Sequence, residues 1–167
     1  AGAGMKDIKR RIKSIESTMQ ITKAMELVSS SKLRRAKEKV EKSRPYFNIL
    51  QETIQKVLDN TKSLKSVYTK EREIKNSLFI VIAGDRGLAG GYNANIIKAA
   101  VAEMEGKNPK IIPIGRKASE YFGKRNYEVV EDYVNVAESL DFIDAALITS
   151  VADEMYRNGK VDEVYVC

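Results

Sequence analysis

Apolar residues recur at helical spacing through the first third of the chain. Alternating steps of four and three from Ile8 to Val57 meet an apolar residue at eleven of fifteen positions, the pattern of a heptad repeat. Between residues 5 and 60 there is no glycine and one proline. We therefore expect one long coiled-coil helix over residues 5–60, with a partner helix along its apolar seam. The seam residues that we assign to this contact are Ile8, Ile12, Ile15, Met19, Leu33 and Val40.

The heptad pattern fails at Thr22, Glu26 and Ser29. The apolar residues there lie one position earlier, Met25 among them, which turns the apolar stripe by about 100° around the helix axis. This shift predicts that the stretch 21–35 meets a different surface from the rest of the seam.

A cationic cluster of Lys32, Arg34 and Arg35 follows this shift. It is either a contact for an acidic partner or a solvated basic face beside an ordinary core stripe, and the pattern leaves both interpretations open. Further along, Pro45 removes one helical hydrogen bond and disfavours α geometry at the residue before it. We expect a kink or a short interruption there.

Beyond residue 76 the periodicity changes. Residues 78–82 form a continuous apolar run, which is typical of a strand buried on both faces. Helical patterns follow at 96–104, 118–124 and 139–155, and further short strands are expected at 110–114, 127–130 and 164–166. Strands that alternate with helices predict a small parallel α/β sheet.

These patterns divide the chain of 167 residues into four parts. We interpret residues 1–4 as sequence left over from cloning, with Met5 as the natural start. The long helix occupies 5–60, a polar connector 61–76, and a small α/β domain 77–167.

Composition narrows the classes of function. The chain has no histidine and one cysteine, Cys167, so it carries neither a Cys/His zinc cluster nor a histidine acid–base catalyst. No apolar run approaches 18 residues, and no membrane span is expected. Residues 1–72 have a net charge of +10, whereas residues 73–167 have −4. The basic part therefore faces water or an anionic partner, and nucleic acid, lipid headgroups and an acidic protein surface are all admissible.

A glycine-rich turn lies between the first strand and the next helix, where a Rossmann fold binds phosphate. Its spacing is not G-x-G-x-x-G, and Gly115-Arg116 follows the second strand instead of the acid that would hold a ribose. We therefore interpret the glycines as serving backbone geometry, expect Asp85 and Arg86 to pair locally or to form an exposed contact, and expect no cofactor or metal. The turn residues are Gly84, Asp85, Arg86, Gly87, Gly90 and Gly91.

Two motifs resemble a known family. The stretch ITKAMELV at residues 21–28, followed by SKLRR at 31–35, is similar to the amino-terminal signature of the gamma subunit of F-type ATP synthase. The turn GDRGLAGGYN at 84–93 resembles that family's motif at the first strand–helix turn of its Rossmann-like foot domain. The motifs occur in the family's order, and the resemblance covers the chain from Met5.

The resemblance implies a rotor shaft with no active site of its own. In the family, proton-driven rotation of the membrane c ring turns the shaft and changes the conformation of the catalytic beta subunits, for ATP synthesis or hydrolysis. The implied partners are the alpha and beta subunits of the catalytic hexamer, the epsilon subunit and the c-subunit ring. Met25, Lys32, Arg34 and Arg35 would contact the lever loop of beta. The implied location is the cytoplasmic face of the bacterial inner membrane, as a peripheral part of F1.

The family continues past the foot with a long carboxy-terminal helix, whereas this sequence ends at Cys167. We therefore expect a fragment, made by truncation or proteolysis, whose foot domain is incomplete and whose coiled-coil partner is its own missing carboxy-terminal helix. The uncovered seam is expected to self-associate.

Two rival interpretations come from other classes of protein. A basic helical module that binds nucleic acid or an anionic membrane would use the +10 segment, but aromatic residues are absent before Tyr46 and the basic residues are not confined to one face. A small dinucleotide-dependent enzyme rests on fold and glycine count alone. Neither rival explains the interrupted heptad, so nucleic acid is not expected as a partner.

Overall fold

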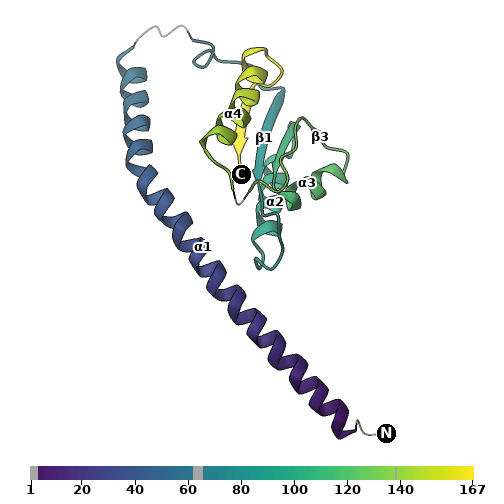
Figure 1. The fold of residues 1–167 in the computed structure, drawn as a ribbon. Coiled ribbons are helices and arrows are strands. Elements are labelled where there is room, and N and C mark those ends of the chain that lie inside the picture. The colour runs from purple at the N-terminus through teal and green to yellow at the C-terminus, as the bar shows by residue number, and fades with distance from the viewer. Residues whose placement is uncertain (1–3, 62–65, 138) are drawn as a thin grey trace. The chain divides into compact units, whose positions relative to one another are not determined.

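The computed structural model describes residues 4–61, 66–137 and 139–167 (Figure 1). The chain divides into two compact units, with the boundary between Leu64 and Lys65. The expectation that the chain opens with leftover sequence lies outside the described residues, Gly4 apart. The expected fold class is confirmed, because a long amino-terminal helix precedes a small parallel α/β sheet.

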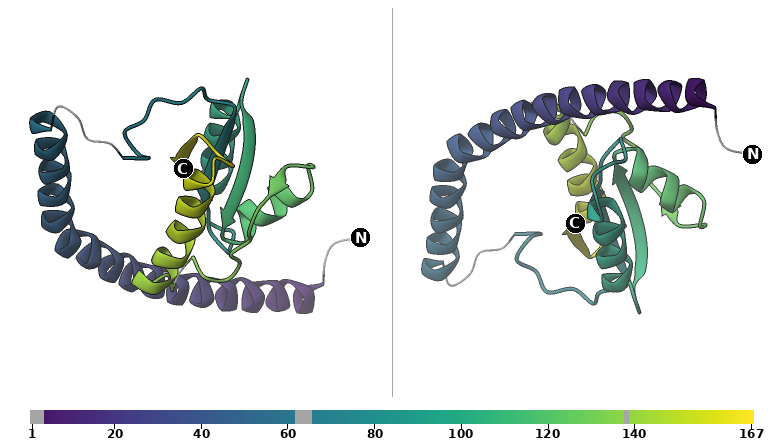
Figure 2. Two further views of the ribbon diagram at one scale, coloured as in Figure 1. Left: turned by 90° about the horizontal axis from the view of Figure 1, so that it is seen from above. Right: turned by 90° about the horizontal axis from the view of Figure 1, so that it is seen from below.

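The first unit is the single helix α1, which spans Met5–Asn60. It runs without a break through Pro45, so the interruption expected there is wrong. Proline removes one hydrogen bond, and the ordered turns on both sides keep the neighbouring residues helical because helix propagation is cooperative. The axis of α1 curves within its carboxy-terminal half, in which Pro45 lies, so of the two expected outcomes the chain shows a bend and no interruption (Figure 2).

The second unit is built on four parallel strands in the order β3-β2-β1-β4. In chain order the elements are β1 Asn76–Ile82, α2 Tyr92–Glu103, β2 Asn108–Ile114, α3 Arg116–Gly123, β3 Glu128–Val129, α4 Phe142–Arg157 and β4 Glu163–Val166. Each parallel connection passes through a helix or a longer loop, as parallel pairing requires.

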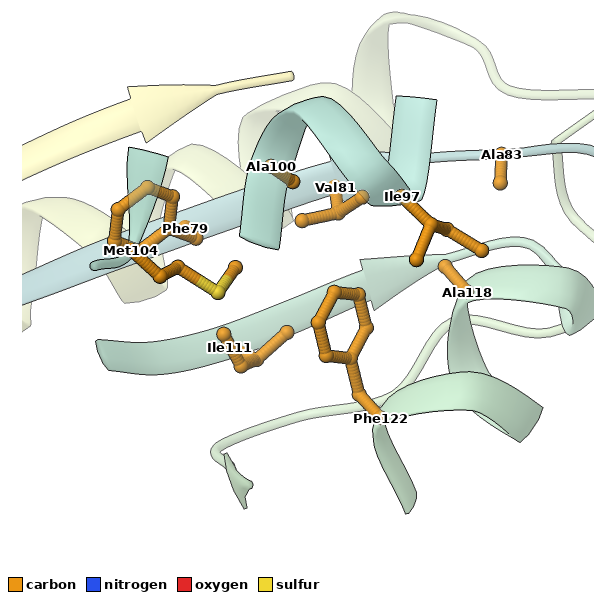
Figure 3. Packing of buried hydrophobic residues seen from close by; sticks show 9 residues of the cluster. All are labelled: Phe79, Val81, Ala83, Ile97, Ala100, Met104, Ile111, Ala118 and Phe122. Atoms are coloured by element: carbon orange, nitrogen blue, oxygen red, sulfur yellow. The ribbon is translucent and has the colours of Figure 1, made fainter. Parts of the chain in front are cut away.

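Both faces of the sheet are buried. Successive side chains of β1 point to opposite faces, and five consecutive residues of this strand are buried. Phe79 and Val81 face α2 and α3, where they join Ile111 and Phe122 in one apolar cluster (Figure 3). The opposite face packs against α4. The buried residues of that second cluster are Leu78, Ile80, Ile112, Ile114, Ile148, Ala152, Met155 and Val161.

Some element boundaries differ from the sequence-based expectation for a local reason. Helix α4 begins at Phe142 and not near Ser139, because Asp141 caps it. The Asp141 carboxylate accepts the N–H groups of Ile143 (2.8 Å) and Asp144 (3.0 Å), and Asp144 accepts the Asp141 N–H (3.1 Å). This capping box fixes the start of the helix more sharply than the apolar pattern does.

Candidate functional site

Helix α1 presents almost its whole surface to solvent, because none of its 56 residues is buried and all except Ser31 are exposed. Its ion pairs are local and exposed, such as Arg10 with Asp7 (3.2 Å) and Lys37 with Glu41 (3.9 Å). Such pairs contribute little, about 0.5 kcal/mol each. A helix of this length therefore requires a partner surface along its apolar stripe.

The predicted seam lies on one stripe of α1. Steps of three and four residues return to the same side of a helix with 3.6 residues per turn. All six side chains are exposed, from 44% at Ile8 to 70% at Leu33. The structure thus brings the seam residues together as an uncovered apolar strip.

The residues assigned to the second contact do not all share a face. Met25 is 48% exposed, and Lys32 lies seven residues further on, almost directly above it at about 10 Å along the axis. Arg35 lies about 80° to one side of this line, and Arg34 lies on the opposite side of the helix. Arg34 also forms an ion pair with Glu38 (3.8 Å). Met25 and Lys32 therefore form one surface, from which Arg34 is turned away.

The glycine-rich turn between β1 and α2 is held by hydrogen bonds from within the second unit. The Asn93 side chain, in the first turn of α2, accepts the Gly84 N–H (2.7 Å) and donates to the Arg86 carbonyl (3.2 Å). Leu88, at the tip, has φ of 61° and is 93% exposed. Asn93 therefore fixes the shape of a turn whose tip stands in solvent.

Asp85 joins this turn to two other loops. Its carboxylate accepts three backbone N–H groups, those of Arg116 (2.9 Å), Asn135 (2.7 Å) and Ala137 (3.2 Å). The sequence led us to expect a local pair with Arg86 or an exposed contact, and the observed role of Asp85 as a backbone acceptor is neither of these. Sequence reasoning missed this role, since the partners lie 31 to 52 residues away.

This arrangement disfavours a nucleotide site at the turn. The Arg116 N–H opens α3, and such a helix N-terminus is where a phosphate would bind. Asp85 already fills that position with a carboxylate, and the Arg116 guanidinium donates to the Asn135 side chain (2.6 Å). An added phosphate would meet a negative charge where it needs a donor. The glycine turn is therefore a structural joint between three loops.

The segment before β1 is bound to α4. The Tyr68 ring stacks on the Tyr156 ring with centroids 5.9 Å apart, and its hydroxyl donates to Asp153 (2.5 Å). The bond to Asp153 raises the pKa of Tyr68. Arg72 lies over the Tyr156 ring (4.0 Å) and donates to the Tyr156 carbonyl (2.7 Å). Residues 62–65 of the expected connector lie outside the described residues, whereas residues 66–76 belong to the second unit.

Asp162 fastens the same segment to the sheet. Its carboxylate accepts the N–H groups of Lys75 (2.9 Å) and Asn76 (3.0 Å). These bonds stabilise the ionised form, and they lower the pKa of Asp162. The entry of the chain into β1 is therefore held by a carboxylate from the loop before β4.

Metal-binding and membrane-spanning features are not found in the part of the chain that the structure describes. Within residues 4–61, 66–137 and 139–167, no three carboxylate or thiol side chains gather in a way that could hold a metal ion. In the same ranges, no helix combines the length and the apolar character needed to cross a membrane.

Comparison with known proteins gives a consistent result. A family model described as ATP synthase matches residues 4–167. The chain is 49% identical over 166 residues to the ATP synthase gamma chain of Alkaliphilus metalliredigens, covering 99% of this chain and 57% of that protein. It is 46% identical to the gamma chain of Ruminococcus albus, covering 97% and 58%. The gamma chain of Acetobacterium woodii, described as sodium ion specific, is 40% identical, with 97% and 54% covered.

Among solved structures, the rotor of Euglena gracilis mitochondrial ATP synthase aligns with a TM-score of 0.38 and 18% identity, covering 71% of this chain and 51% of that chain. The chain spans somewhat more than half the length of the curated relatives named above.

An uncovered helix of 56 residues joined to a small α/β unit is typical of a subunit of a larger assembly. The chain belongs to the ATP synthase family whose model it matches, and curated gamma chains are among its relatives. The sequence-based resemblance to that family is thereby confirmed. The rival interpretation as a nucleic-acid or membrane-binding module has no support from this family.

Proposed function

We propose that the chain is part of the gamma subunit of an F-type ATP synthase and works as its central rotor shaft. The observation that carries the proposal is α1, a helix of 56 residues with no buried residue and two differently oriented apolar stripes. Membership of the ATP synthase family supports it. The second unit serves as the foot of the shaft.

The shaft couples two processes without catalysing either. Rotation of the c-subunit ring turns the foot and α1, and α1 then contacts the beta subunits differently at each angle. A rotor position changes a catalytic site only through contact free energy that differs between the conformations of that site. The shaft must therefore be asymmetric around its axis, and the change of stripe near Met25 supplies such asymmetry.

The residues divide between two contacts. The seam of Ile8, Ile12, Ile15, Met19, Leu33 and Val40 packs against the carboxy-terminal helix of the complete subunit. Met25 and Lys32 share a face and contact the acidic lever loop of beta, and Arg35 lies at the edge of this contact. Arg34 belongs to a neighbouring contact with the alpha and beta subunits, because it points the other way.

The foot unit holds the epsilon subunit and rests on the c ring, at the cytoplasmic face of the bacterial inner membrane. In this proposal residues 5–60 are the shaft, 61–76 the connector and 77–167 part of the foot. Protons are the coupling ion, although the sodium ion specific relative makes Na⁺ a necessary control in every assay.

The first experiment asks whether the chain recognises its assembly. The chain is immobilised, incubated with a membrane-free lysate of its source at moderate salt, and the bound proteins are identified by mass spectrometry. Recovery of alpha, beta or epsilon subunits supports the shaft. Their absence, also with a chain extended beyond Cys167, would refute it.

The second experiment tests the contact at Met25 with a matched control. Met25→Lys, introduced into the gamma subunit of the reassembled enzyme, places a second cation against an acidic loop. One added ion pair worth about 1 kcal/mol slows the step that breaks it about fivefold. Leu27→Lys adds the same charge two residues away, about 160° around the helix.

We expect ATP-driven rotation and ion pumping to fall more with Met25→Lys than with Leu27→Lys, because Leu27 lies on the side of the helix that carries Arg34 and faces away from the lever loop. Far-ultraviolet circular dichroism of both variants checks that the helix is intact. Equal rotation rates for Met25→Lys and wild type would overturn the assignment of Met25.

A further inference from the structure

A groove of about 610 Å³ runs between α2 and α3 on the outer side of the second unit. Both helices cover the same face of the sheet, and their inner sides, which include Phe122 of α3, pack over Val81 and Ile111 (Figure 3). Their outer sides form the two walls. Neither the glycine turn nor α1 contributes a lining residue.

The rims of this groove are strongly basic. Lys98 stands on the α2 side, and Lys117, Lys124 and Arg125 stand on the α3 side, against a single acid, Glu120. This concentration of cations contrasts with the net charge of −4 that residues 73–167 carry together. The positive charge is therefore gathered at one place on an otherwise acidic unit.

Only part of this charge is compensated inside the protein. Lys117 lies 3.8 Å from Glu120, and Arg125 stacks on the Tyr121 ring at 3.8 Å. Lys98 and Lys124 are exposed. Neither forms a hydrogen bond or an ion pair with a residue that the structure describes. Two rim lysines, one on each wall, thus point to an anionic partner.

The floor between the rims is apolar. Ala94, Ile97 and Val101 follow one another on α2 at helical spacing, and Tyr121 lines the groove from α3. The span from Ala94 to Val101 is about 10 Å, which equals two turns of a helix. An apolar strip of this length between two cationic rims has the form of a groove that accepts an amphipathic helix.

We propose that the α2–α3 groove binds an acidic amphipathic helix of a partner protein. Apolar side chains of that helix, spaced three or four residues apart, would cover the floor, and its carboxylates would meet Lys98 and Lys124. Charge complementarity across the rims steers the approach and sets the orientation. A nucleic acid or a phosphate group would leave the apolar floor uncovered. A flat lipid surface would not reach it. The proposal does not rest on the rotor function, because the groove lies wholly within the second unit.

The experiment follows the labelling of individual lysines in the full chain. The probe is a synthetic helical peptide with leucines along one face and glutamates elsewhere. Lysine acetylation is quantified by mass spectrometry with and without the peptide. Labelling each lysine separately is necessary because α1 is also basic and would attract an acidic peptide. At a peptide concentration about ten times the dissociation constant, acetylation of an occupied lysine falls about tenfold. We expect this loss at Lys98 and Lys124 and not at the exposed Lys70 and Lys160.

Two matched variants test the apolar floor. Ala94→Gln fills the floor with a neutral polar side chain and restores acetylation of Lys98 and Lys124. Ala99→Gln makes the same change on the same helix outside the groove and leaves the protection intact. Circular dichroism confirms that both variants are folded.

Three results would overturn the proposal. Acetylation of Lys98 and Lys124 could stay unchanged up to millimolar peptide. A scrambled peptide of the same composition but without an apolar face could protect both lysines equally. Phosphatidylglycerol vesicles or single-stranded DNA could protect them as well as the peptide does, which would make the groove a general anion site.

Discussion

Gly115 is the position where one added methyl group should do most damage. It follows β2 and precedes α3 with φ of 92°, in the left-handed half of conformational space. A Cβ atom there would lie 2.0 Å from the carbonyl oxygen of Ala83 and 2.9 Å from its carbonyl carbon. Both neighbours are backbone atoms at the end of β1. They cannot turn aside as a flexible side chain would.

The cost of Gly115→Ala can be estimated from the bonds that a shift would disturb. A non-bonded carbon and oxygen need more than 3 Å, so the ends of β1 and β2 must separate by about 1 Å. The nearby bonds are Ala83 N–H to Ile114 (2.9 Å) and Lys117 N–H to Gly84 (3.1 Å). Weakening both costs about 2 kcal/mol. With φ of 92° and ψ of 144°, Gly115 lies near a region that is essentially restricted to glycine, which adds about 1–3 kcal/mol for alanine. We expect a total loss of about 3–5 kcal/mol, a large part of the 5–15 kcal/mol that stabilises a typical domain.

Urea denaturation measures this loss. Seven of the eight tyrosines lie beyond residue 65 and the chain has no tryptophan, so tyrosine fluorescence and near-ultraviolet circular dichroism report on the second unit. With a slope of about 1–2 kcal/mol per molar urea, the midpoint falls by about 1.5–5 M.

Two control variants separate the steric cost from the backbone cost. Gly106 also has positive φ (75°), but a Cβ there meets no atom within 4 Å, so Gly106→Ala should cost only about 1 kcal/mol. Gly123 has open space and no positive φ, and Gly123→Ala should be neutral or stabilise by up to about 1 kcal/mol. If Gly115→Ala cost no more than Gly106→Ala, the steric argument would be refuted.

Three further predictions use the same urea assay. Phe122→Ala removes a fully buried ring and should lower the free energy of unfolding by about 3–5 kcal/mol. Phe142 is 85% exposed, so Phe142→Ala should change it by less than about 0.5 kcal/mol. Similar losses for both variants would contradict the burial of Phe122 in the core. Asp85→Ala removes the acceptor of three N–H groups and should lower the free energy of unfolding by about 1–3 kcal/mol. Asp85→Asn should lie between this variant and wild type. An unchanged midpoint for Asp85→Ala would refute the role of Asp85 in joining the three loops. The N–H groups of its two backbone partners lower the pKa of Asp162. Its carboxylate therefore stabilises the fold above the unfolded pKa of about 3.9. This contribution to the free energy of unfolding is lost as the pH falls through the lower folded pKa. In Asp162→Asn that part of the acid dependence should be missing, and an identical dependence in both proteins would show that these bonds do not stabilise the fold.

The sequence predicts the helices and strands well where burial of an element produces a regular pattern of apolar residues. The run at Leu78 and the helical spacing after it define β1 and α2, because a buried strand must be apolar throughout and a covering helix must repeat every three to four residues. Boundaries are weaker. Asp141 sets the start of α4 through hydrogen bonds that an apolar pattern does not record.

The long helix and its apolar stripes were determined by the sequence alone, because each depends on residues three to seven positions apart. Three features were decided only by the tertiary structure. They are the hydrogen bonds between Asp85 and other loops, the attachment of Tyr68 to α4, and the basic groove between α2 and α3. Their members lie up to 88 residues apart, as Tyr68 and Tyr156 do, and local spacing carries no information about which distant backbone amides or side chains will meet. Packing of α2 and α3 on one face of the sheet, and of α4 on the other, brings those groups together.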